Sequence, residues 1–137
     1  MGTWAAGPFD NDTAADWCGE LDDAAPERRP ALVERALRAA LDEPGPLDSD
    51  LAVEAVAAAA VVAAHLPGVP RVDSAYAPDF LTAGGRADLP DRLRPLAVQA
   101  LDRVVADDSE LAELWAEAGE PNEFVAELAI VRAALAG

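Results

Sequence analysis

Residues 49–66 read SDLAVEAVAAAAVVAAHL, and this stretch decides the fold. After Glu54 no polar residue follows until His65. A helix that is apolar on every side must be covered on every side by other parts of the protein. The sequence therefore predicts a central helix over residues 49–66, capped by Asp48 or Ser49 and surrounded by the other helices.

The rest of the chain supplies amphipathic segments that can cover this helix. Apolar residues recur at helical spacing in each segment, and Pro, Gly or capping residues mark the ends. These signals predict helices from residues 10–12 to before Pro26, over 29–41, 90–106 and 109–118, and from 121 onward. A chain of 137 residues suits one domain. We therefore predict an all-α fold, a single-domain bundle of about five to six helices over residues 1–137.

Three details of this arrangement can be checked directly. Glu34 and Arg38 are spaced one helical turn apart, which predicts an ion pair on the outer surface. Val105 is predicted to close the apolar stripe of the helix over residues 90–106. Residues 67–89 form the longest irregular stretch that the sequence predicts.

The charge of the chain limits its partners. It carries 26 acidic residues against 10 basic ones, all of which are Arg, so the net charge is −16. Nucleic acids and anionic membranes are bound through Lys and Arg, and here the field has the opposite sign. We therefore expect no nucleic acid and no membrane as partners, and an attraction for a basic protein or a cation.

Cysteine content and the N-terminal sequence bear on location. Cys18 is the only cysteine, so no disulfide forms within the chain, and its helical spacing predicts a place on the buried face. The N-terminus has neither the basic region nor the apolar core of a signal peptide. The apolar run after Glu54 is shorter than the roughly 20 residues of a membrane-spanning helix. We expect a cytoplasmic protein.

Residues 1–17 read MGTWAAGPFDNDTAADW. This run resembles the opening of a family of small bacterial proteins, the domain of unknown function 4259, which typically reads Met-Gly-x-Trp-Gly-x-Gly-x-Phe-(Asp/Glu)-Asn-Asp. The matching residues are Trp4, Gly7, Phe9, Asp10, Asn11, Asp12, Ala14, Asp16 and Trp17. The run Ser-Glu-Leu-x-x-Leu-Trp over residues 109–115 is similar to a C-terminal segment of the family, whereas Ala5 departs from its usual Gly. The resemblance implies that the chain is related to this family, and it implies no activity.

Three carboxylates in this N-terminal region form the candidate metal site: Asp10, Asp12 and Asp16. Carboxylate oxygens are ligands for Ca²⁺ and Mg²⁺, but a calcium loop needs an oxygen ligand at the next alternate position, where Ala14 stands. Capping of the first helix explains the same acids without a metal. No nucleophile lies nearby in the sequence, so we predict no catalytic residues and no cofactor.

Aromatic side chains and one amide form a second candidate set, for contact with a ligand or a partner. Its members are Trp4, Phe9, Asn11, Trp17, Tyr76 and Trp115. Tryptophan and tyrosine dominate many binding surfaces, but they also dominate cores. Packing of the three tryptophans into one cluster is the alternative.

Two functions remain open on these grounds. The first is a non-enzymatic protein-interaction module, of inhibitor or immunity type, whose acidic surface binds a basic partner. The alternative is a metal-dependent hydrolase or a small-ligand binder that uses residues 10–12 and Asp16 with the loop of Tyr76 and Asp79. The sequence leaves open whether the protein is a monomer or a homodimer.

Overall fold

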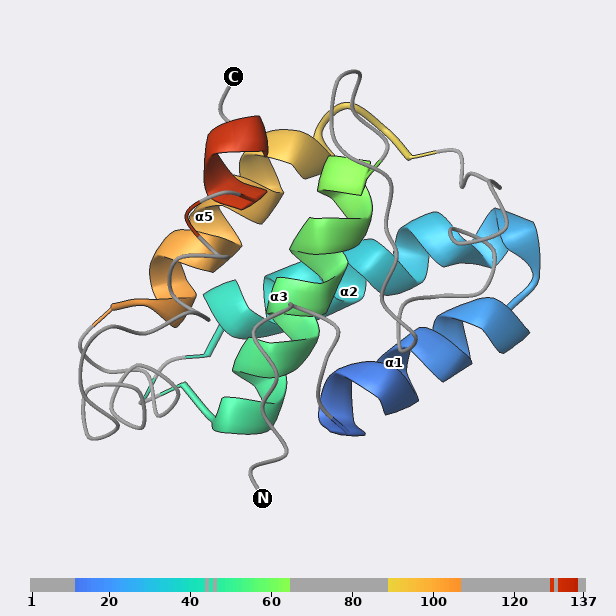
Figure 1. Ribbon diagram of the computed structural model, residues 1–137, viewed down its shortest axis with the longest axis horizontal. Helices are drawn as coiled ribbons and strands as arrows, with labels where there is room; N and C mark the ends of the chain where they lie inside the picture. Colours follow the sequence, from blue (N-terminus) through green and yellow to red (C-terminus); the bar gives the residue numbers. More distant parts are fainter. Residues whose placement is uncertain are drawn as a thin grey trace.

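The fold is an all-α helical bundle, as predicted. The computed structural model describes residues 12–43, 45, 47–64, 89–106, 129 and 131–135. Within these ranges the chain is mostly helical and contains no β-strand. The elements are α1 (Asp12–Asp23), the 3-10 helix η1 (Pro26–Arg28), α2 (Arg29–Leu41), α3 (Ser49–Ala64) and α5 (Leu93–Val104), and residues 131–135 are also helical (Figure 1).

Helix α3 is the central element of the bundle. It packs against α1, α2 and α5, which lie around it (Figure 1). The five consecutive residues 55–59 have no exposed surface at all. Successive helical residues point about 100° apart, so five of them cover every direction around the axis. The prediction of a helix enclosed on all sides is therefore confirmed for α3, and the last two residues of the predicted helix, 65 and 66, lie outside the described residues.

Local signals explain where the helices begin. The Oδ1 atom of Asp48 accepts hydrogen bonds from the backbone N–H of Asp50 at 2.8 Å and of Leu51 at 3.4 Å, so Asp48 is the N-cap of α3. Helix α2 has the predicted bounds, with Pro30 in its first turn. Helix α5 begins only at Leu93, after a turn in which the carbonyl of Pro90 accepts the N–H of Leu93 at 3.1 Å.

The core combines the small residues of α3 with large side chains from its neighbours. Leu21 of α1, Leu37 of α2 and Leu93 of α5 have no exposed surface. Because alanines on α3 let the neighbouring helices approach closely, these leucines fill the space around it. Val105 was predicted to be buried with them, and this is wrong: α5 ends at Val104, and Val105 is 47% exposed.

The predicted helices over residues 109–118 and from 121 to 128, and the irregular stretch over 67–88, lie outside the described residues. In the part of the chain that the structure describes, no helix is both long enough and apolar enough to cross a membrane.

Candidate functional site

Four carboxylates gather where α1 packs against the first turns of α3. They are Glu20 of α1, the N-cap Asp48, and Asp50 and Glu54 of α3, and we call them the acidic patch. Asp50 and Glu54 are four residues apart and so share one face of the helix. Glu20, Asp48 and Asp50 are exposed, whereas Glu54 is half-buried. The patch therefore has an exposed rim and one carboxylate set deeper in the surface.

Glu54 is the electrostatic centre of the acidic patch. Its partial burial raises the pKa of its carboxyl above the ordinary value, and the charges of Glu20, Asp50 and Asp48 raise it further. Like charges and loss of water both disfavour the ionised form. A cation placed at this carboxylate would reverse both effects, because it would offset the repulsion and replace the lost hydration.

No side chain in the described residues neutralises Glu20 or Glu54. The ion pairs in this part of the chain lie elsewhere: Glu34 is shared by Arg38 and Arg92, each at 2.8 Å, and the hydrogen bonds from Arg38 and Arg92 hold the pKa of Glu34 below its ordinary value. The predicted ion pair between Glu34 and Arg38 is thereby confirmed. Glu20 and Glu54 therefore keep their negative charges without an ion-pair partner among the described residues.

Most of the described arginines are used within the fold. Arg132 pairs with Asp102 at 2.6 Å and links the helical residues 131–135 to α5. Three more bond to backbone carbonyls: Arg29 to Leu21 and Asp22, Arg94 to Leu135 and Arg103 to Gly45. These arginines tie different parts of the described chain together.

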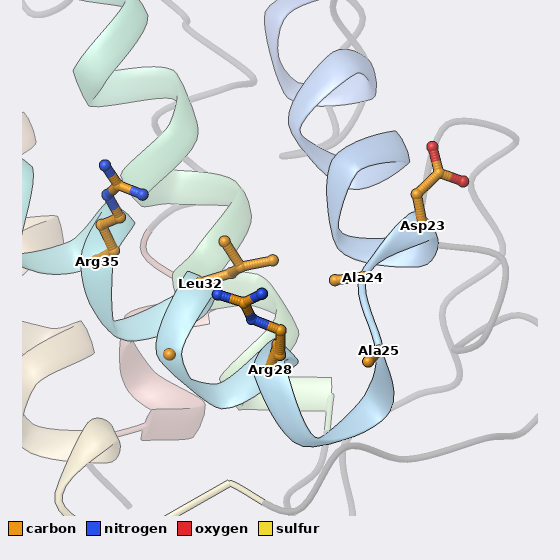
Figure 2. A pocket seen from close by; sticks show the side chains of 7 residues that line it. Asp23, Ala24, Ala25, Arg28, Leu32 and Arg35 are labelled. Atoms are coloured by element: carbon orange, nitrogen blue, oxygen red, sulfur yellow. The ribbon is translucent and has the colours of Figure 1, made fainter.

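A second surface feature is an open hollow between the end of α1 and α2 (Figure 2). It has a volume of about 470 Å³. Its lining combines one acidic, two basic and four apolar side chains, namely Asp23, Ala24, Ala25, Arg28, Ala31, Leu32 and Arg35. Its charge is opposite in sign to that of the acidic patch, because two exposed arginines outnumber its one acidic residue. Leu32 lies between these arginines and the end of α1 (Figure 2).

The predicted metal site is only partly within the described residues. Asp12 is the first residue of α1 and Asp16 follows one turn later as an exposed side chain, whereas Asp10 lies outside the described ranges. Among the residues that the structure describes, no group of three or more His, Cys, Asp or Glu side chains is arranged to hold a metal ion. Because Asp10 is not among these residues, the metal site stays a prediction.

Trp17 is the member of the aromatic candidate set that the structure describes. It is 6% exposed and belongs to the core with Cys18 and Leu21. This place favours packing over direct contact with a partner. Trp4, Phe9, Asn11, Tyr76 and Trp115 lie outside the described residues, so their predicted role in binding stays a prediction.

Cys18 lies in the core, where its helical spacing placed it. It is 2% exposed and forms no disulfide. Burial, with a smaller contribution from the charge of Asp22, raises the pKa of the Cys18 thiol to about 12. A nucleophilic cysteine needs a thiolate, so this thiol is unsuited to that chemistry.

Neither the acidic patch nor the hollow is among the candidate sites that the sequence predicts. One local signal for the patch is present, since Glu54 interrupts an apolar helix one turn after Asp50. For the hollow, the signal is that Arg28, Leu32 and Arg35 recur at helical spacing. Both sites also need a neighbouring element, which spacing within one helix does not identify.

The chain belongs to the family Domain of unknown function (DUF4259), whose family model matches residues 2–127. This match confirms the family that the sequence resembles. Comparison with curated proteins and with solved structures gives no significant match. The family description states no activity.

Proposed function

We propose that this protein is a non-enzymatic interaction module that binds a basic partner through the acidic patch. The observation that carries the proposal is Glu54, a half-buried carboxylate that has no ion-pair partner in the described residues and whose pKa the charges of Glu20, Asp50 and Asp48 raise further. An Arg or Lys side chain from a partner supplies the missing charge. An inhibitor or immunity-type role against a basic protein is part of this proposal and is compatible with the same chemistry.

The net charge of −16 supports this proposal at longer range. A strongly acidic protein attracts a basic partner before contact and so accelerates association. The proposal includes a cytoplasmic location, which the single free cysteine favours, because proteins of oxidising compartments commonly carry paired cysteines.

The test measures binding of a short oligo-arginine peptide by fluorescence anisotropy. The double variant Glu20→Gln, Glu54→Gln removes two charges from the acidic patch and leaves the N-cap Asp48 in place. The double variant Glu27→Gln, Asp91→Asn is the matched control, because it removes two exposed charges outside the patch. We expect the patch variant to weaken binding by roughly tenfold and the control to change it little, because each exposed pair contributes up to about 1 kcal/mol.

Salt and pH provide two further readouts of the same binding. Raising the salt from 0.1 M to 1 M shortens the screening length from about 10 Å to about 3 Å, so the affinity should fall steeply. A bound cation favours ionised Glu54, whose pKa in the free protein is raised, so affinity should increase as the pH rises through that pKa. Equal losses in the patch and control variants, or binding that salt leaves unchanged, contradict the proposal. If the patch is confirmed, the natural partner can be isolated from cell lysate with the unaltered protein as bait and the patch variant as the negative control.

A further inference from the structure

The hollow between α1 and α2 is open to solvent and is large enough to hold a small molecule. Its volume of about 470 Å³ lies within the range of roughly 300–1,000 Å³ that is typical of such sites. Arg28, Leu32 and Arg35 are separated by four and three residues, so they line one face over two turns, with the apolar side chain between the two cations (Figure 2). Ala24 and Ala25 form the facing wall.

The charge at this hollow is unusual for the molecule. The described residues include eight arginines, and Arg28 and Arg35 are the two whose guanidinium groups have no hydrogen-bond or ion-pair partner within the described part of the chain. Acidic residues outnumber arginines by 26 to 10, so partners are plentiful elsewhere. Two exposed cations on either side of one apolar residue form a local site for an anion.

The walls of the hollow are held in place by the chain itself. The Nε and Nη2 atoms of Arg29 donate hydrogen bonds to the carbonyls of Leu21 and Asp22, both at 3.0 Å. The N–H of Arg28 donates to the carbonyl of Ala25 at 2.8 Å. These contacts fix the backbone at the corner between α1 and α2, so the walls of the hollow are preformed, whereas the side chains of Arg28 and Arg35 must be ordered by the ligand.

The geometry points to a second binding site in this hollow, for a small organic anion that has an apolar body and an acidic group. The apolar body lies over Leu32 and the alanines, and the acidic group lies between the guanidinium groups of Arg28 and Arg35. Asp23 at the other end repels a second negative charge and so sets the orientation of the ligand. A small anion fits better than a polyanion, because an extended acidic partner would meet the repulsion of the whole −16 surface. This site is independent of the acidic patch and takes the opposite charge.

The test uses anilinonaphthalene sulfonate as the probe and phenylnaphthylamine, the same ring system without the sulfonate, as its neutral counterpart. Amide chemical shifts of the full chain are followed by NMR during titration with each compound. The variants are Arg28→Gln and Arg35→Gln, and the control is Arg38→Gln, which removes a cation from the same helix outside the hollow. Thermal unfolding of each variant verifies that the fold is retained.

We expect the sulfonate to shift the amides of the hollow, at residues 24–35, and to bind more tightly than the neutral compound. Each of the two hollow variants should weaken the sulfonate by roughly threefold to fivefold, and Arg38→Gln should have little effect. Equal affinity for the two compounds, an equal loss with Arg38→Gln, or shifts confined to other parts of the chain would each overturn the assignment.

Discussion

Enclosure of α3 on every side predicts that no direction around its middle tolerates a larger side chain. Ala57, Ala58 and Ala59 have no exposed surface, and they point about 100° apart around the helix. An ordinary amphipathic helix would direct one of three such positions toward solvent. We therefore expect Ala57→Leu, Ala58→Leu and Ala59→Leu all to destabilise the protein.

The size of this effect follows from the burial. Leu adds three carbon atoms beyond the Cβ of Ala, and the surrounding core must move to accept them. Overpacking of this kind costs about 1–3 kcal/mol. An unfolding entropy of about 2.1 cal/mol/K per residue, taken over 137 residues, gives roughly 0.3 kcal/mol/K, so Tm should fall by about 3–10 °C.

Differential scanning calorimetry measures these shifts. Ala133→Leu is the control, because Ala133 is exposed within the helical residues 131–135 and Leu has a helix propensity close to that of Ala. The control should leave Tm within about 1 °C, as expected for a surface substitution. If any of the three α3 variants matched the control, α3 would have an open side and the reasoning from its apolar sequence would fail.

Three further predictions concern single side chains. Arg29→Ala should lower the free energy of unfolding by about 1.5–3 kcal/mol, because the carbonyls of Leu21 and Asp22 lose a charged donor. Arg29→Lys should restore only part of this free energy, because an ammonium lacks the two-pronged geometry of the guanidinium group. Urea denaturation measures the loss, and full recovery in Arg29→Lys would contradict this explanation. Glu54→Gln should stabilise the protein at neutral pH, because the raised pKa makes the ionised carboxylate costly, and this advantage should vanish below the unfolded pKa of about 4.3. Unfolding curves that keep the advantage in acid would contradict that cause. Cys18 should react with a thiol reagent only after unfolding, and rapid labelling of the folded protein would refute its burial and its pKa of about 12.

The sequence predicts those parts of the fold that depend on local signals. Helix α2 has the expected bounds because Pro30 marks its beginning and the run of residues 44–46 follows its end. The ion pair of Glu34 and Arg38 needs only the spacing of one turn. Enclosure of α3 follows from its composition, since an all-apolar helix has one stable environment in a globular protein.

The surfaces proposed for binding depend on contacts between helices, which spacing does not supply. Glu20 reaches the acidic patch only because α1 packs against α3. The hollow needs the corner that Arg29 fixes between α1 and α2. Val105 shows the same limit within one helix, because a periodic pattern continues past the residue at which the backbone leaves the helix.

The four carboxylates of the acidic patch do not contribute equally to the functional argument. Asp48 caps α3 and Asp50 lies in its first turn, where a negative charge is favoured, so the fold itself accounts for both. Glu54 lies beyond the first turn, where that benefit fades, and its ionised form is costly. Residues that cost stability are commonly found at functional sites. The variant Glu20→Gln, Glu54→Gln therefore separates the two roles: a gain in stability together with a loss of binding identifies a site, whereas a gain in stability alone leaves these carboxylates as surface charge.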